Sequence, residues 1–290
     1  MISTKGFKAY DIRGVVPSDV NEELAYALGR SLAFYLKAKT LVVGHDIRLS
    51  GPSLRDAAVR GMRDMGTNVI DLGQCGTEMI YFAVFHLKAD GGMMITASHN
   101  PAEYNGMKLV RSGSRPISGD TGLKDLAAMV VDPDFETKYP KAAQQGSYEQ
   151  VDIVPSYVDH LLSYIDTKEI APLNIVANPG NGGAGPIVKE LAKHLPCHFT
   201  RTVLIILTIR RTVISPTAFP IRSLLRTVMP QATLSAGKGP ILALPGTGIL
   251  TAASSLMKMD ASSKGIILSV FLPLTSSKSI LAPRFSLTRV

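Results

Sequence analysis

The first two-thirds of the chain alternates helical segments with short apolar runs. The clearest helical segment is residues 21–37, and Asn21 is a suitable N-cap for it. Its apolar face consists of Leu24, Ala25, Leu28, Leu32, Tyr35 and Leu36. The spacing also predicts helices at 52–65 and 78–87 and strands at 41–43, 68–70 and 92–95. This alternation predicts an α/β fold with a mainly parallel sheet and crossover helices.

A second α/β segment follows a looser stretch at 132–145, which has the composition of a linker. The predicted elements of this second segment are a helix at 155–165, a strand at 173–177 and a helix at 186–195. We therefore divide the chain into a first domain at 1–140, the start of a second domain at 150–197, and a tail at 198–290.

The tail differs from the rest of the chain in both pattern and charge. It is rich in Ser, Thr, Leu, Ile and Arg, and no regular spacing persists in it. It holds eleven of the 31 basic residues but only one of the 23 acidic residues, Asp260, so residues 1–197 contain 20 basic and 22 acidic residues. The net charge of +8 therefore comes from the tail, and we expect no nucleic-acid partner.

Composition also bears on where the protein works. The 290 residues suffice for one large or two ordinary domains. Residues 1–6 lack the apolar core of a secretory signal, and the longest apolar stretch, 203–209, is too short to span a membrane. Cys75 and Cys197 stand far apart without metal-type spacing, so we interpret both as small buried side chains in a reducing compartment. We expect a cytoplasmic protein with no membrane partner.

The clearest candidate for chemistry is residues 96–101, which we name the serine loop. Ser98 follows the predicted strand 92–95 and is next to the imidazole of His99, while Asn100 and Pro101 break the strand. Ser98 should therefore lie at the carboxyl end of a strand, where open α/β sheets bind ligands. A polar turn that only caps the next segment is the alternative interpretation.

The serine loop is followed by residues 102–108, which end in Lys108. These features together resemble the α-D-phosphohexomutases, the family that includes the bacterial phosphomannomutases, from Phe7 to about Leu195. Several further segments carry the resemblance in the same order, namely Tyr10–Gly14, Gly44–Gly51, Gly76–Ala83, Arg115–Gly122 and Asn178–Gly185.

The resemblance implies a mixed, mainly parallel sheet sandwiched by helices. It also implies an enzyme that interconverts hexose 1-phosphate and hexose 6-phosphate through a phosphoserine, here Ser98, and a bisphosphate intermediate. The implied substrates are the 1- and 6-phosphates of mannose or glucose. The implied cofactor is Mg²⁺, bound in part through the Ser98 phosphate, and the implied activator is glucose or mannose 1,6-bisphosphate.

The family pattern also assigns roles to individual residues. It implies that His99 and Lys108 manage protons and charge beside Ser98, and that Tyr10 and Arg13 line the floor of the site. Asn100 is a candidate substrate ligand, and Arg48 and Asn105 are candidates for supporting the serine loop. Simpler roles are a turn cap for His99, a solvated charge for Lys108, an Asp11 ion pair for Arg13 and a helix-start contact for Arg48.

The chain departs from the family in its last third. The resemblance implies four domains and a loop of three aspartates that ligate Mg²⁺, and the translated sequence contains neither that loop nor the later domains. We therefore expect little or no mutase turnover from this polypeptide. A non-catalytic remnant is an alternative function.

A shifted reading frame would explain the tail. Shifting the frame by one base permits a stretch across 214–228 that resembles the family's second domain, and one across 243–254 that is similar to its metal loop. We hypothesise a shift near 198–203, with a genuine basic extension as the alternative. Resequencing of the DNA decides between them.

The glycines of residues 180–185 suggest a function of another class. They lie between a predicted strand and a predicted helix, as in the dinucleotide-binding fingerprint of Rossmann oxidoreductases. That fingerprint needs an acidic residue about twenty positions later to bind the ribose. Residues 198–230 contain no Asp or Glu, so nicotinamide binding is the weaker hypothesis.

Overall fold

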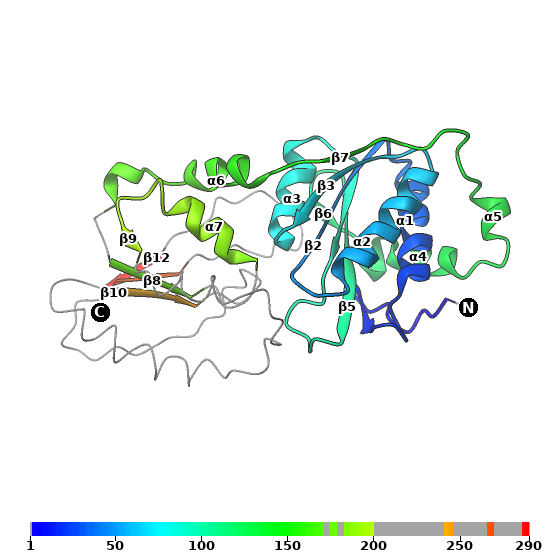
Figure 1. Cartoon of the computed structure of the whole chain (residues 1–290), viewed down its shortest axis with the longest axis horizontal. Coiled ribbons are helices and arrows are strands. Elements are labelled where there is room, and N and C mark those ends of the chain that lie inside the picture. Colours follow the sequence, from blue (N-terminus) through cyan, green and yellow to red (C-terminus); the bar gives the residue numbers. More distant parts are fainter. Residues whose placement is uncertain are drawn as a thin grey trace. The chain divides into compact units, whose positions relative to one another are not determined.

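A computed structural model describes residues 2–170, 174–178, 183–199, 241–245, 266–269 and 286–289. The chain divides into two compact units, Met1–Ile153 and Val154–Val290, which we describe separately (Figure 1). The first unit ends later than the predicted boundary at residue 140.

The first unit is built on a seven-stranded mixed sheet. The strand order is β1-β5-β4-β2-β3-β7, and the short β6 pairs with β5. Strands β2, β3, β4 and β7 are parallel, whereas β5 is antiparallel to β1, β4 and β6. The bounds are β1 Ile12–Val15, β2 Thr40–His45, β3 Asn68–Gln74, β4 Gly91–Ile95, β5 Tyr104–Arg111, β6 Arg115–Pro116 and β7 Tyr148–Gln150. The mixed sheet is confirmed, but half of its strand pairings are antiparallel.

Helices cover both faces of this sheet (Figure 1). The helices are α1 Glu22–Leu36, α2 Gly51–Asp64, α3 Thr77–His86, α4 Lys124–Val130 and α5 Phe135–Lys138, and a π-helical turn at Gly119–Leu123 precedes α4. Alternate residues of β2 and β4, such as Leu41 and Met93, join α1, α2 and α4 in one buried cluster. The opposite face packs against Ile80 and Val84 of α3. The predicted layering of a sheet between helices is therefore confirmed.

Helix α1 begins as its sequence predicts. The backbone N–H of Leu24 donates to Asn21 Oδ1 at 2.9 Å, so Asn21 caps the helix. Leu24, Leu28 and Leu32 of the predicted apolar face are fully buried, although Tyr35 is 36% exposed. The helix ends at Lys37, whose backbone is left-handed with a φ of 49°.

Helices α1 and α2 approach closely because glycines stand at their contact. A Cβ built on Gly61 would lie 2.2 Å from the carbonyl oxygen of Tyr26, and one on Gly29 would lie 2.3 Å from that of Ala58. Backbone atoms cannot move aside as side chains do, so these positions require glycine.

Replacing Gly61 by alanine is therefore expected to destabilise the protein. Overpacking costs up to about 3 kcal/mol, and the better helix propensity of alanine offsets about 1 kcal/mol of it. We expect a net loss of about 2 kcal/mol in the free energy of unfolding, measured by urea titration. The exposed Arg60 on the same helix is the control, and Arg60→Ala should change stability by about 0.5 kcal/mol or less. An unchanged midpoint for Gly61→Ala would contradict the close approach.

The predicted linker at 132–145 is wrong in part, because this segment packs on the first unit. Arg30 has no exposed surface, and its guanidinium donates to Glu136 Oε1 and to the carbonyl of Tyr139, both at 2.5 Å. It also lies 4.7 Å from the ring centre of Phe135 in α5. These contacts, together with the pairing of β7 with β3, extend the unit to Ile153.

The second unit contains α6 (Val154–Leu162), the 3-10 turn Thr167–Glu169 and α7 (Ala184–Leu191). Strand β8 (Asn174–Asn178) pairs in parallel with β9 (His198–Phe199) and β10 (Ile241–Pro245), and β11 (Ile266–Ser269) pairs antiparallel with β12 (Ser286–Arg289). The strand predicted at 173–177 and the helix predicted at 186–195 correspond to β8 and α7. Most of the tail, and Gly180 to Gly182 of the glycine segment, lie outside the described residues, so the predictions for them stay predictions.

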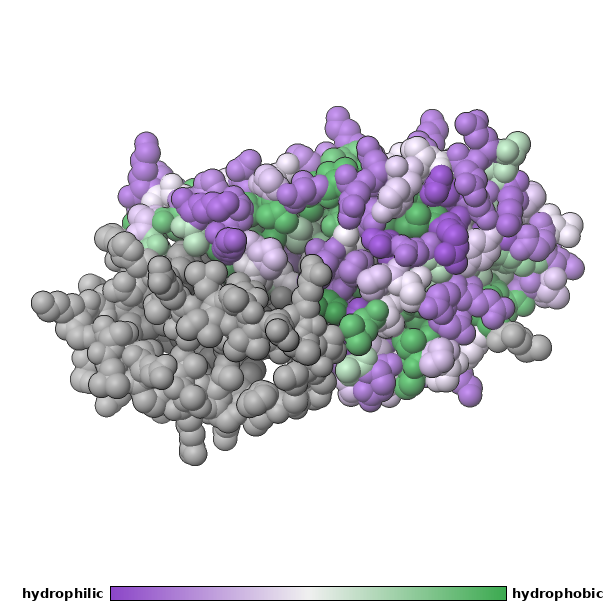
Figure 2. All heavy atoms as spheres, in the orientation of Figure 1, coloured by the Kyte–Doolittle hydropathy of each residue, from purple (hydrophilic) through white to green (hydrophobic). Residues whose placement is uncertain are grey.

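Two further observations concern the predictions from composition. No helix in the described ranges has the length and apolar character needed to cross a bilayer, and the visible face of the first unit is mostly hydrophilic (Figure 2). Cys75 is 3% exposed, and burial raises the pKa of its thiol, as expected for a small buried side chain. Cys197 is partly exposed, so its predicted burial is wrong.

Candidate active site

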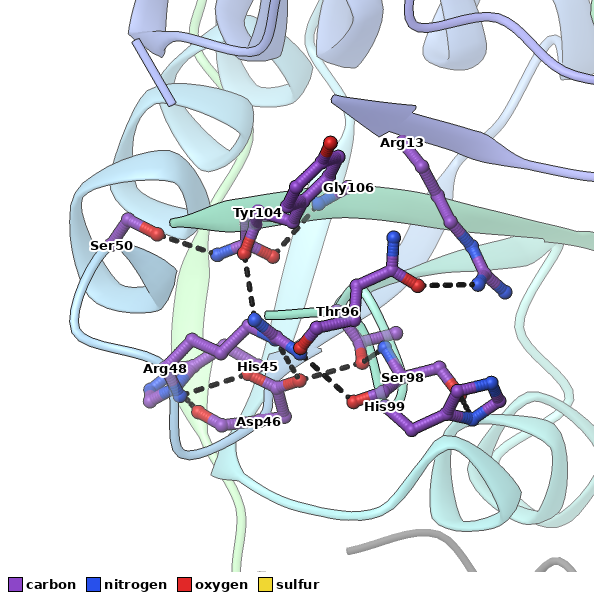
Figure 3. Close-up of polar contacts among 12 residues, drawn as sticks. Arg13, His45, Asp46, Arg48, Ser50, Thr96, Ser98, His99, Tyr104 and Gly106 are labelled. Atoms are coloured by element: carbon purple, nitrogen blue, oxygen red, sulfur yellow. Dashed lines mark hydrogen bonds and ion pairs between the residues drawn. The ribbon is translucent and has the colours of Figure 1, made fainter. Parts of the chain in front are cut away.

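The serine loop joins the ends of two buried strands. Strand β4 ends at Ile95, the loop follows directly, and β5 begins at Tyr104 (Figure 3). Two turns shape it, because the N–H of Asn100 donates to the carbonyl of Ala97 and the N–H of Tyr104 to that of Pro101. The loop therefore lies at the carboxyl end of β4, as predicted.

Ser98 presents its hydroxyl next to an imidazole. Its Oγ lies 3.1 Å from Nδ1 of His99 (Figure 3). Its backbone φ is 59°, in the left-handed region that residues other than glycine rarely adopt. Ser98 is half-buried and His99 is exposed. This is the arrangement that a serine nucleophile and a proton acceptor need, since the ring nitrogen can take or return the hydroxyl proton.

Arg48 binds backbone carbonyls of the serine loop and of Tyr104. Its Nη1 donates to the carbonyls of Pro101 at 2.6 Å and Tyr104 at 2.8 Å. Its Nη2 donates to those of Ser98 at 3.0 Å and Asn100 at 2.6 Å (Figure 3). The Arg48 side chain is 7% exposed, and of the four bonds the one to Pro101 is open to water. The Arg48 side chain therefore contacts the serine loop itself, and its supporting role stays a prediction.

Two cations share one carboxylate beside the serine loop. Asp11 Oδ2 accepts from Arg13 Nε at 3.0 Å, from Arg13 Nη2 at 2.8 Å and from Lys108 Nζ at 2.6 Å. Arg13 also donates from Nη1 to Oδ1 of Asn100 at 3.2 Å, which joins the pair to the loop. Two positive charges against one negative charge leave a net positive site, which suits a phosphoryl group on Ser98.

Strand pairing brings these cations together from distant parts of the sequence. Arg13 lies in β1 opposite Gly106 of β5, and Lys108 lies in β5 opposite Met94 of β4. A Cβ built on Gly106 would lie 1.9 Å from the carbonyl oxygen of Ile12, so the close pairing of these strands needs glycine there. The sequence analysis predicted no strand at residues 102–108, and the structure places Lys108 in β5.

Asn105 joins the start of β5 to the start of α2. It is fully buried, and its Nδ2 donates to Oγ of Ser50 at 2.8 Å while its Oδ1 accepts from the N–H of Gly106 at 2.8 Å (Figure 3). This agrees with a supporting role. Tyr10 is 78% exposed, so the structure does not place it in a buried floor of the first unit, and its role stays a prediction.

The sequence analysis named Asp11 as an ion-pair partner of Arg13, which the structure shows, but it missed that Lys108 shares this carboxylate. It also missed Asp46 and Thr96. Asp46 follows β2, and its Oδ2 accepts from the Thr96 hydroxyl at 2.6 Å. The sequence offered one signal for them. Both lie inside the segments that carried the family resemblance.

Burial raises two pKa values near this end of the sheet. The pKa of Glu78, at the start of α3, is raised above its ordinary value because its carboxyl is desolvated. The pKa of Tyr81 in the same helix is raised by burial and, to a smaller extent, by the charge of Asp11. Desolvation is therefore the main cause at both side chains.

The described residues do not fit the implied metal. They contain no group of three or more His, Cys, Asp or Glu side chains placed to hold a metal ion. We derive no step through Mg²⁺.

Comparison with known proteins agrees with the fold. Residues 4–134 match the family described as phosphoglucomutase/phosphomannomutase, alpha/beta/alpha domain I. Over these residues the chain matches domain I of that family.

Individual relatives share about half of their aligned residues with the chain. A phosphomannomutase of Salmonella montevideo is 50% identical over 189 residues, which is 65% of this chain and 41% of the relative. A protein of Xanthomonas campestris named phosphohexose mutases is 51% identical over 195 residues, or 67% of this chain and 43% of the relative. The chain thus spans about two-fifths of the length of these curated relatives.

A solved structure gives the same result. The chain is similar to a phosphoglucomutase/phosphomannomutase family protein from Burkholderia thailandensis, with a TM-score of 0.59 and 35% identity. The similarity covers 69% of this chain and 44% of that protein.

Proposed function

We propose that the chain carries the phosphoserine of a phosphomannomutase-type enzyme. In this proposal Ser98 exchanges a phosphoryl group with hexose phosphates, so that hexose 1-phosphate and hexose 6-phosphate interconvert through a bisphosphate. The observation that supports it most is the Ser98 hydroxyl, 3.1 Å from the His99 ring nitrogen, in a loop held by Arg48. The substrates are mannose 1- and 6-phosphate, with the glucose phosphates as the alternative.

The proposed step transfers the phosphoryl group from Ser98 to the sugar. A sugar hydroxyl attacks the phosphorus of phosphoserine 98, the bond from phosphorus to Ser98 Oγ breaks, and the sugar becomes a bisphosphate. The proton of the sugar hydroxyl passes to water as the bond to phosphorus forms, and Ser98 Oγ takes a proton from water through the ring nitrogen of His99. The reverse sequence at the other end of the sugar regenerates the phosphoserine. Arg13 and Lys108 offset negative charge on the phosphoryl oxygens.

We also propose that this polypeptide alone has little or no mutase turnover. It spans about two-fifths of the length of its relatives, and the matched region leaves about a third of the chain uncovered. The Mg²⁺ and the hexose 1,6-bisphosphate activator implied by the resemblance stay predictions.

The test is phosphoryl uptake by the purified 290-residue chain. The chain is incubated with glucose 1,6-bisphosphate, or with mannose 1,6-bisphosphate, and digested for mass spectrometry. We expect one phosphoryl group on the peptide that contains Ser98, and no steady conversion of mannose 1-phosphate to mannose 6-phosphate. Phosphate on a different peptide contradicts the serine assignment, and sustained conversion contradicts the proposed inactivity.

A further inference from the structure

The backbone of Ser98 needs an external constraint. Its φ of 59° is unfavourable for a residue with a side chain, so the surrounding structure must hold it. Arg48 holds the carbonyl of Ser98. The amide N–H of Ser98 has a different hydrogen-bond partner, which is the second constraint on this conformation.

That partner is the hydroxyl of Thr96. The Ser98 N–H donates to Thr96 Oγ1 at 2.9 Å, and Thr96 Oγ1 donates its own proton to Asp46 Oδ2 at 2.6 Å (Figure 3). A hydroxyl has a single proton, so its donation to a carboxylate leaves the oxygen free to accept from the amide. Thr96 is 2% exposed, and water therefore has little access to this relay.

Asp46 is itself fixed on several sides. Its Oδ1 accepts from the N–H of Arg48 at 2.9 Å, and its own N–H donates to the carbonyl of Ile95 at 3.0 Å. Its Oδ2 also lies 3.4 Å from Arg48 Nε. The Asp46 carboxylate thus orients two groups. One is the Thr96 hydroxyl, which accepts from the Ser98 amide, and the other is the Arg48 guanidinium, which donates to the loop carbonyls.

We propose that Asp46 and Thr96 are positioning residues for phosphoryl transfer, because together they hold Ser98 in the conformation that presents its Oγ to His99. The relay acts through the backbone of Ser98 and touches neither substrate nor phosphoryl group. This inference rests on the proposed function for its catalytic consequence. The constraint on the amide is independent of that function.

The substitution Thr96→Val tests the relay, since valine keeps the shape of threonine without the hydroxyl. Thr67→Val is the matched control. Thr67 is 1% exposed and its hydroxyl also bonds within the same unit, to the carbonyl of Ala38 at 2.8 Å, away from the serine loop. Thr96→Ser keeps the hydroxyl and should restore the parent behaviour.

Two measurements are made on each full-length variant, namely hydrogen exchange at the Ser98 amide and the rate of phosphoryl uptake from glucose 1,6-bisphosphate. For Thr96→Val we expect amide exchange at least about 10-fold faster and uptake at least about 10-fold slower, with little change in the bisphosphate concentration for half-maximal rate. Thr67→Val should change neither. A double variant with Asp46→Ala should lose less uptake than the two single losses multiplied, because both act through one relay.

The outcomes for the Asp46–Thr96 relay differ from the outcomes for the proposed phosphoryl transfer. Unchanged exchange at the Ser98 amide in Thr96→Val overturns the relay, and so does an equal loss of uptake in Thr67→Val, which would mean a stability effect only. Faster exchange in Thr96→Val together with no uptake in any protein, parent included, would support the relay and count against the proposed function.

Discussion

Replacing Ser98 by alanine is expected to abolish phosphoryl uptake from glucose 1,6-bisphosphate, with a rate at least about 1,000-fold below that of the parent chain. The reason is that the proposed transfer needs an oxygen at this position to form the phosphate ester, and alanine has none. Single-turnover labelling, followed by peptide mapping, measures the rate. The variant keeps His99, Arg13 and Lys108, so any residual uptake measures what these residues do without the Ser98 hydroxyl.

The control for this variant must also place alanine at a left-handed backbone position. Ser114 has a φ of 56°, close to the 59° of Ser98, and its Oγ bonds the carbonyl of Tyr81 at 2.6 Å, outside the serine loop. Ser114→Ala should lose some stability and keep its uptake. If both variants lose uptake equally, backbone strain explains the loss, and the assignment of Ser98 as phosphoryl acceptor fails.

Replacing Arg48 by methionine is expected to have the second largest effect, a loss of uptake of at least about 100-fold and a lower melting temperature. The substitution leaves four carbonyls of the loop region without their donor and Asp46 without its ion pair. Each of these hydrogen bonds to a charged donor contributes up to about 3 kcal/mol, so the loop should leave this conformation and move the Ser98 hydroxyl away from His99. Calorimetry and single-turnover labelling measure the two effects.

Lysine should not rescue this position. Its ammonium is a single donor centre, whereas the planar guanidinium reaches two pairs of carbonyls at once. Arg63→Met is the control, because Arg63 lies in α2, and its Nε donates to the carbonyl of Gly146 at 2.8 Å, away from the loop. Full uptake by Arg48→Met would show that the loop keeps its conformation without these four bonds.

The elements that the sequence predicted well are those whose signals are local. Helix α1 has its N-cap at Asn21, its acidic first turn and its apolar spacing within one continuous segment. Strands β2, β3 and β4 are short buried runs with the same property. By contrast, the sequence analysis did not predict β5. Its first half has no continuous apolar run, and the strand is stabilised by pairing with β1 and β4. Segment 132–145 was predicted as a linker because its contact with Arg30 is visible only in the folded chain.

The site divides in the same way. Ser98 and His99 are neighbours in sequence, and the strand before them and the proline after them indicate where the loop lies. Arg13 and Lys108 are 95 residues apart in number, and they meet on Asp11 only because β1 and β5 pair. The link from Asp46 to Thr96 likewise needs β2 and β4 to be parallel neighbours, so that both carboxyl ends reach one edge of the sheet.

The sequence by itself determined the α/β class, the place of the serine loop and the family resemblance up to about residue 195, because each is encoded in contiguous residues whose spacing and order survive without coordinates. Only the tertiary structure decided how Ser98 is held and which carboxylates serve the cations. These contacts join atoms from separate strands, and hydrogen bonds of 2.6 to 3.1 Å depend on register and side-chain direction, which residue order alone does not specify.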